Sequence, residues 1–267
     1  MRLKALFIML GMMLGTSATA LNFDLTKSPK GFETLSGIAV TVAPTDNSDQ
    51  VLVQVKGIDH PMNGVVFLTK AEDRAAETRS YNFIRDGRER SLLLHHKAAR
   101  TEYLWVFLPG QGRVALFPSP EQTERIDHPA LLTLYEQQKE AGTQSDIARF
   151  NRERKVADSQ KLLDISDNSA NRRCDSGFRT VVDWNSIPDD ILMVIKPREY
   201  CGLIANEFNY MCREDAAMRR FAQGIQQINC QFGDRLKLDR DDTAIYFQTE
   251  KDAPNQIEFV HDYFRNL

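Results

Sequence analysis

The sequence predicts an α+β protein in two parts. The first is an N-terminal antiparallel β-sandwich or barrel; after a helical connector comes a C-terminal disulfide-bonded helical hairpin with a small β-hairpin. Three observations predict this fold class. Apolar and polar residues alternate over residues 36–117, as in half-buried strands. Apolar residues recur at three- and four-residue steps over residues 198–228, as in amphipathic helices. All four cysteines lie between Cys174 and Cys230.

The first twenty residues have the pattern of a signal peptide. Arg2 and Lys4 precede an apolar run over residues 5–15, and small residues lead up to Ala20. The run is shorter than the roughly 20 residues that a membrane-spanning helix needs. We therefore expect cleavage after Ala20, a mature chain that begins at Leu21, and a periplasmic or secreted protein.

Charge and length narrow the function classes. Loss of the leader leaves 247 of the 267 residues and takes the formal charge from −3 to −5. Such a chain is long enough for two domains with cores of their own. It has no basic excess of the kind that nucleic-acid-binding proteins carry, so no nucleic-acid partner is predicted. No membrane span is expected after cleavage of the leader.

We expect a β-domain over residues 21–126. Six or seven short strands separated by Gly, Pro, Asn and Asp are typical of a sandwich, for instance an immunoglobulin-like one, or of a barrel. Asp86 and Gly87 between two such runs indicate a hairpin. Arg88, Glu89 and Arg90 follow, and they favour a loop longer than two residues.

Residues 127–173 are predicted to form a helical connector. One helix begins near His128 and Pro129, and a second, polar helix is capped by Ser145 or Asp146 and ends near Ile165. Residues 166–171 are polar and loop-forming. They place the start of the C-terminal domain, residues 174–267, at the first cysteine.

The C-terminal domain is expected to contain a short strand near residues 180–184 and three helices, followed by a β-hairpin and a final helix. Pro188 and Pro197 mark the first two helix starts. The third helix begins at Glu214 and extends through Ile228. The turn of the hairpin falls at residues 239–242.

Four cysteines in an exported chain predict two disulfides. Their wide spacing, with no histidine between them, argues against zinc. Cys201 and Cys212 are eleven residues apart on one predicted helix, about 16 Å along its axis. Bonded Cα atoms lie about 4.4–6.8 Å apart, so these two cannot pair. An antiparallel helical hairpin favours Cys201–Cys230 with Cys174–Cys212; the alternative is Cys174–Cys201 with Cys212–Cys230.

No metal or cofactor site is predicted. His95 and His96 are adjacent on a strand and point to opposite faces, so a metal site would need His60 beside one of them. We expect the three to be ordinary loop and strand residues. Residues 239–250 resemble a calcium loop, but Ala244 stands where that loop needs glycine.

The sequence carries no recognisable catalytic motif. The acid–base candidates are His261 and Asp262 in the final predicted helix, with Asp183 and Asp189 elsewhere in the chain. The architecture favours a non-enzymatic protein-binding module, such as an inhibitor, an immunity-type protein or an accessory of envelope assembly. A periplasmic hydrolase without a recognisable motif and a small-ligand carrier remain as alternatives.

Overall fold

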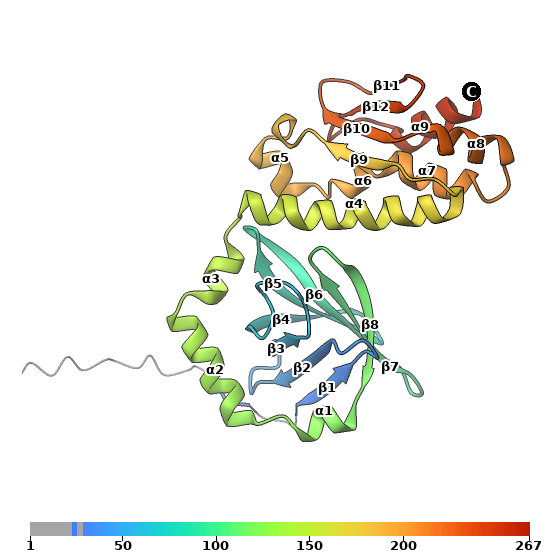
Figure 1. Ribbon diagram of the computed structural model, residues 1–267. Coiled ribbons are helices and arrows are strands. Elements are labelled where there is room, and N and C mark those ends of the chain that lie inside the picture. The colour runs from blue at the N-terminus through green and yellow to red at the C-terminus, as the bar shows by residue number, and fades with distance from the viewer. Residues whose placement is uncertain (1–22, 26–28) are drawn as a thin grey trace, which may run out of the picture.

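The first half of the chain is a closed antiparallel β-barrel (Figure 1). The computed structural model describes residues 23–25 and 29–267, so the predicted leader lies outside the described residues. Each strand pairs with the next in sequence, and the first pairs with the last. The strands are β1 (Lys30–Glu33), β2 (Ala39–Pro44), β3 (Gln50–Lys56), β4 (Val66–Ala75), β5 (Thr78–Arg85), β6 (Arg88–Lys97), β7 (Glu102–Leu108) and β8 (Gly112–Pro118).

Because β1 closes the sheet, the β-domain is a barrel rather than a sandwich. The expected immunoglobulin-like arrangement is therefore wrong. The sequence pattern indicates β2 to β8 but not β1, which is short and contains a glycine. A Cβ on Gly31 would lie 2.7 Å from Gln122 Cβ and from Thr123 N. Helix α1 (Pro120–Glu124) therefore packs directly on the backbone of β1, and only glycine permits this contact.

The β5–β6 hairpin has a two-residue turn rather than the longer loop predicted. Arg85 pairs with Arg88, and Asp86 and Gly87 both have positive φ, at 52° and 72°. Two successive left-handed residues form the type I′ turn whose twist suits a hairpin. The Gly87 N–H donates to Ala148 O at 2.7 Å, which ties the turn to the helices that follow.

Three helices connect the barrel to the rest of the chain. Helix α2 (His128–Glu140) starts as predicted: the Asp127 side chain accepts a hydrogen bond from Ala130 N at 3.0 Å. The second predicted helix is instead two helices. Helix α3 (Thr143–Ala148) is short, and α4 (Arg152–Cys174) begins after Asn151, whose side chain caps it. Figure 1 shows α2 and α3 beside the barrel and α4 across one end of it.

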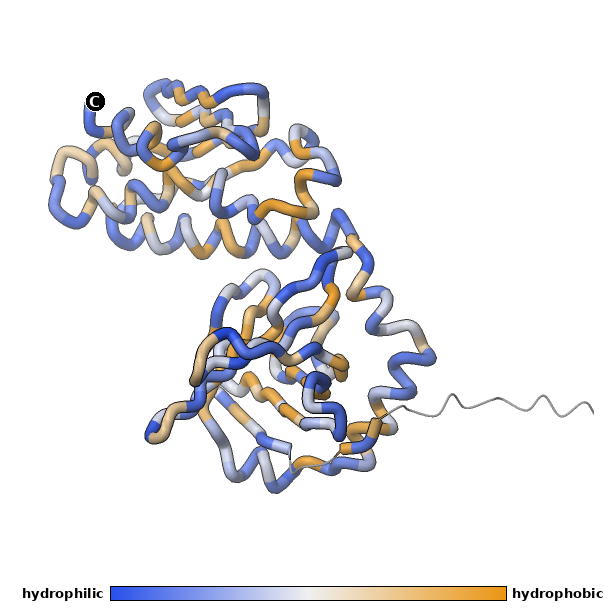
Figure 2. The backbone as a smooth tube through the Cα atoms, turned by 180° about the vertical axis from the view of Figure 1, so that it is seen from behind, coloured by the Kyte–Doolittle hydropathy of each residue, from blue (hydrophilic) through white to orange (hydrophobic). Residues whose placement is uncertain are grey.

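Helix α4 continues through residues 166–171, which were expected to form a loop. Its polar side chains do not interrupt it because they bond within the fold. Ser159 Oγ donates to Lys155 O at 2.7 Å, one turn back. Ser166 Oγ accepts from Arg198 Nε at 2.8 Å. Figure 2 shows α4 as a largely hydrophilic helix with short hydrophobic stretches, and those stretches join the C-terminal core.

The second half of the chain contains a four-stranded mixed sheet of order β11-β12-β10-β9. Strands β9 (Arg179–Val182), β10 (Gln227–Phe232) and β12 (Ala244–Thr249) are parallel, and β11 (Lys237–Arg240) is antiparallel to β12. The β11–β12 hairpin is as predicted. The remaining helices are η1 (Trp184–Ser186), α5 (Asp189–Val194), α6 (Arg198–Cys201), α7 (Leu203–Met211), α8 (Ala216–Gly224) and α9 (Gln256–Arg265).

One predicted helix boundary in this half is wrong. Helix α8 ends at Gly224, and Ile228 lies on the central strand β10. Ile228 and Cys230 are both buried, while Asn229 between them is only half-buried. Alternation of buried and less buried residues marks a strand. It covers only a few residues here, and their apolar positions also continue the helical spacing of the segment before them, so the predicted helix extends too far.

Both disulfides have the favoured pairing. Cys174–Cys212 and Cys201–Cys230 have Cα separations of 5.3 and 5.5 Å. Their structural setting differs from the predicted helical hairpin: the first bond joins the end of α4 to the end of α7, and the second joins α6 to strand β10. The two bonds therefore fasten the helical layer to itself and to the sheet.

Two disulfides are consistent with a periplasmic or extracellular protein, because such bonds persist in oxidising compartments. Among the helices of the described residues, none combines the length and apolar composition of a membrane span.

We expect removal of either disulfide to destabilise the protein. The bonds link residues 38 and 29 positions apart, and constraining loops of this size in the unfolded chain is worth about 2–4 kcal/mol. Replacing Cys201 and Cys230 together by alanine, or Cys174 and Cys212 together, should lower the free energy of unfolding by this amount in urea titrations. Non-reducing peptide mapping that finds Cys174 joined to Cys201 would contradict the pairing.

The outer edge of strand β9 is closed by a buried carboxylate. Asp167 of α4 is 4% exposed. Its Oδ2 accepts from Thr180 N at 2.7 Å, and its Oδ1 accepts from Thr180 Oγ1 at 2.7 Å. Burial raises the pKa of Asp167 in the folded protein, against the lowering effect of these hydrogen bonds. The carboxylate thus satisfies an N–H group that an edge strand otherwise presents to other chains.

Asp167 gives a prediction with a matched pair of variants. Because folding raises the pKa of Asp167, the folded protein favours the protonated form of this carboxyl. The stability that Asp167 contributes is therefore present at low pH and is lost as pH rises through the raised pKa. Asp167→Asn is neutral and keeps an acceptor, so stability at pH 7 should stay within about 1 kcal/mol. Asp167→Ala leaves Thr180 N–H without an acceptor and should cost about 1–3 kcal/mol. Equal urea midpoints for the two variants would contradict this role.

Candidate functional site

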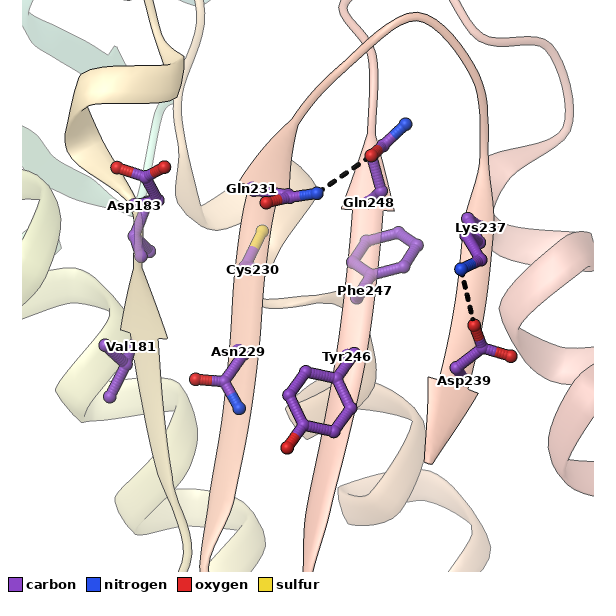
Figure 3. A pocket seen from close by; sticks show the side chains of 11 residues that line it. Val181, Asp183, Asn229, Cys230, Gln231, Lys237, Asp239, Tyr246, Phe247 and Gln248 are labelled. Atoms are coloured by element: carbon purple, nitrogen blue, oxygen red, sulfur yellow. Dashed lines mark hydrogen bonds and ion pairs between the residues drawn. The ribbon is translucent and has the colours of Figure 1, made fainter. Parts of the chain in front are cut away.

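The C-terminal sheet buries one face and leaves the other uncovered. Tyr246 on β12 is 47% exposed, while its neighbours Ile245 and Phe247 are buried in the core at 0% and 1%. The same alternation holds on the other strands of the sheet. We call the uncovered side the open face. Its side chains, drawn in Figure 3, are Val181, Asp183, Asn229, Gln231, Lys237, Asp239, Tyr246 and Gln248.

The open face is neutral at its centre and charged at its sides. The central strands β10 and β12 carry amides, and Gln231 Nε2 donates to Gln248 Oε1 at 2.8 Å across them. The flanking positions carry Asp183 after β9 and an ion pair on β11, with Lys237 Nζ 2.8 Å from Asp239 Oδ2. Between them the face is hollowed, with a volume of about 430 Å³.

Tyr246 is held in place by the turn before its strand. Its hydroxyl donates to Asp241 Oδ2 at 2.9 Å, which raises the pKa of Tyr246. The pKa of Asp241 is lowered, first by the Thr243 N–H and then by the Tyr246 hydroxyl. Asp241 Oδ1 also accepts from Ala244 N at 2.7 Å. The aspartate that resembled a calcium ligand in sequence therefore organises a turn and orients the tyrosine.

The edges of this sheet are less accessible than its open face. Asp167 closes the β9 side, as described above. Strand β11 on the other side is four residues long, with exposed Lys237, Asp239 and Arg240. Short, charged edges disfavour the addition of a further strand. A partner therefore has better access to the open face than to either edge.

The open face has the chemistry of recognition. Its amides both donate and accept hydrogen bonds, and its tyrosine combines an apolar ring with a polar end. A nucleophile paired with a general base is not among its side chains. Over the part of the chain that the structure describes, no three His, Cys, Asp or Glu side chains are grouped so as to hold a metal ion.

The histidines of the barrel lie in separate environments. His60 is buried beneath α4, with Nδ1 accepting from Met62 N at 3.1 Å and Nε2 3.4 Å from Asp158. His95 Nε2 lies 2.8 Å from Glu102 Oε1, and burial lowers the pKa of His95. The ring of His96 lies against Tyr103, 4.9 Å between centroids. The fold does not bring the three together.

The acid–base candidates of the C-terminal half are also separate. His261 Nδ1 lies 2.7 Å from Glu207 Oε1, a partner that the sequence pattern does not indicate. Asp183 caps η1 through Asn185 N. Asp189 forms an ion pair with Arg152. The described contacts thus join His261 to Glu207 rather than to Asp183 or Asp189.

The barrel interior is filled by its own side chains. Phe32, Leu93, Leu104 and Leu116 are 0% exposed and belong to one continuous core.

The sequence alone does not single out the open face. The alternation within residues 227–232 and 244–249 is a usable signal for two-sided strands. It does not reveal which side is covered, because that depends on where helices from distant parts of the chain pack.

Comparison of the chain with protein-family models, with curated proteins and with solved structures found no match.

Proposed function

We propose that this protein is an exported, non-enzymatic protein-binding module and that it binds its partner through the open face. The observation that carries the proposal is the distribution of side chains on that face. Neutral amides and Tyr246 occupy the centre, and Asp183, Lys237 and Asp239 lie at the sides. Protein interfaces have this anatomy, with charged residues depleted from the centre and tyrosine enriched there.

A folded protein is the partner that suits this surface. An extended peptide that added a strand would need an accessible sheet edge, and Asp167 and the short β11 obstruct both edges. A face of four strands with a shallow hollow suits a convex surface that presents its own hydrogen-bonding groups. Inhibition of an enzyme or toxin and assembly in the cell envelope both use such contacts.

Export is the part of the proposal that concerns residues 1–20. The two disulfides support it, because they need an oxidising compartment to persist. We expect protein purified from its native source to begin at Leu21 and to contain no free thiols. Intact-mass measurement before and after alkylation checks both. A full-length chain with four alkylated cysteines would contradict export.

Tyr246 is expected to dominate the binding energy. A central tyrosine that is buried on binding contributes about 2 kcal/mol or more, close to thirtyfold in affinity. A photo-crosslinking amino acid at position 231 in cells should capture the partner. The affinity of that purified partner for Tyr246→Ala should then fall by about thirtyfold, measured by titration calorimetry.

Tyr210 provides the matched control, since it is 62% exposed and lies on α7 away from the open face. Tyr210→Ala should leave the affinity unchanged, and both variants should unfold at the same urea concentration as the parent within about 0.5 kcal/mol. If crosslinks arise equally from position 210, or if Tyr210→Ala weakens binding as much as Tyr246→Ala, the open face is not the binding surface.

A further inference from the structure

A cleft lies where the barrel meets the C-terminal half. The barrel contributes residues beside the β5–β6 turn and at the β7–β8 turn, and the other wall consists of α4 and the segment between α5 and α6. Its volume is about 290 Å³. Figure 1 shows α4 passing across this end of the barrel. The cleft is separate from the open face and shares no lining residue with it.

The lining of the cleft is strongly cationic. Arginine and lysine side chains enter it from both walls, and they are Arg85, Arg90, Lys155, Lys196 and Arg198. Two carboxylates, Asp86 and Asp158, accompany these five cations. Full ionisation therefore leaves an excess of three positive charges within the lining. Lys196 Nζ also lies 2.8 Å from Glu199 Oε1, outside the lining, so the other four cations carry the uncompensated charge.

The two carboxylates are already engaged by side chains outside the lining. Asp86 Oδ1 accepts from Arg154 Nη2 at 3.1 Å, and Asp158 Oδ2 lies 3.4 Å from His60 Nε2. Arg85 Nε, which is buried, lies 3.5 Å from Asp86 Oδ2 but makes no hydrogen bond in the described structure. The acids thus neutralise the cleft only in part.

Lys155 is the least compensated of these cations. It is half-buried on α4, and its ammonium group has no ion pair or hydrogen bond among the described residues. Burial and then the positive charge of Arg90 lower its pKa to about 8, with a further lowering by Arg85. Asp86 and Asp158 raise it less than these effects lower it. A half-buried cation of this kind is stabilised by an anion that enters beside it.

Two of the arginines are fixed before any ligand arrives. Arg90 Nη2 donates to Met193 O at 3.1 Å, across the junction between barrel and C-terminal half. Arg198 Nε donates to Ser166 Oγ at 2.8 Å. Their guanidinium groups therefore lose little side-chain entropy on binding an oxyanion, and each retains further N–H donors.

Part of the wall is apolar. Phe107, Leu162 and Pro197 line the cleft together with the cations. A ligand that fits both parts has a compact, multiply charged group and a less polar remainder. A phosphate monoester carries a charge of about −1.5 to −2 at pH 7, which offsets about half to two-thirds of the excess, whereas one carboxylate offsets only a third of it.

We propose that this cleft binds a small molecule bearing a phosphate group, with Lys155 and the arginines around it contacting the phosphate oxygens. The ligand would contact the barrel and the C-terminal half at the same time. Its binding would therefore stabilise their relative position, independently of any protein bound to the open face.

Titration calorimetry of the full chain with inorganic phosphate and with glycerol 3-phosphate, at constant ionic strength, tests the proposal. Lys155→Gln should weaken binding of both by about tenfold or more, the usual effect of losing a hydrogen bond to a charged group. Arg198→Gln, from the start of α6 on the same wall as Lys155, should weaken binding of both ligands similarly, and it replaces the first variant if that one is unstable. Absence of saturable binding to the parent would overturn the proposal.

Lys161→Gln is the matched control. Lys161 lies on the same helix, is exposed, pairs with Asp59 and does not line the cleft. Its replacement should change phosphate affinity by less than about twofold, since surface charges contribute little. If Lys161→Gln lost as much phosphate affinity as Lys155→Gln, the loss would be due to general surface charge, and this outcome would contradict a defined site.

Sulfate keeps its charge near neutrality, so a pH dependence of its binding reports the protonation of Lys155 rather than that of the ligand. Its affinity for the parent should fall as pH rises through about 8, where Lys155 loses its proton, and should not fall in Lys155→Gln. A parent affinity that is flat across this range would exclude Lys155 as a contact.

The source of the phosphate is distinguished with vesicles. Sedimentation with vesicles of phosphatidic acid in phosphatidylcholine that depends on Lys155 would identify a lipid headgroup, whereas Lys155-dependent binding of glycerol 3-phosphate alone would identify a soluble ester.

Discussion

The structure depends on helix α4, a polar helix whose side chains are bonded at both ends to different parts of the fold. Near its start, Arg154 binds Asp86 at the β5–β6 turn. Near its end, Asp167 binds Thr180 on the edge strand, and Cys174 is joined to Cys212. A helix is the stiffest short element available, so these contacts fix the barrel relative to the C-terminal sheet. The cationic cleft depends on this arrangement, because both parts line it.

The two sites follow from different consequences of that packing. The helices cover one side of the C-terminal sheet and leave the other side free, which creates the open face around Tyr246. Where α4 crosses the barrel, cations of both parts are brought together around Lys155 with too few carboxylates to balance them. The first surface is broad and neutral at its centre, and the second is small and positively charged. They are suited to ligands of different kinds.

Much of the local structure was predictable from the sequence, because it depends on neighbouring residues. The alternation of apolar residues indicates β2 to β8, and Asp127 marks the start of α2. The favoured disulfide pairing also agrees, although Cys230 lies on a strand rather than a helix. The separation of Cys201 from Cys212 along a helical segment excluded only a bond between those two, and that exclusion holds. The antiparallel helical hairpin that favoured this pairing over the alternative is not formed as predicted, because Cys230 lies on β10.

The features that the sequence did not predict depend on contacts between residues far apart in the chain. Strand β1 is a strand because β2 and β8 both pair with it, and its own four residues carry little signal. Residues 166–171 are helical although they are polar, because Arg198 donates a hydrogen bond to Ser166 and Thr180 donates to Asp167. The open face and the cationic cleft are likewise products of tertiary packing. No local pattern in the sequence distinguishes Tyr246 or Lys155 from the other tyrosines and lysines of the chain.

The order of the cysteines along the chain has a consequence for biogenesis. The bonds interleave: Cys201 lies within the loop closed by Cys174 and Cys212, and its own partner Cys230 lies beyond that loop. If oxidation followed the order of the cysteines along the chain, Cys174 would be joined first to Cys201, which is a non-native link. Native connectivity therefore requires either that the helices pack before the thiols oxidise or that a disulfide isomerase exchanges the early bond.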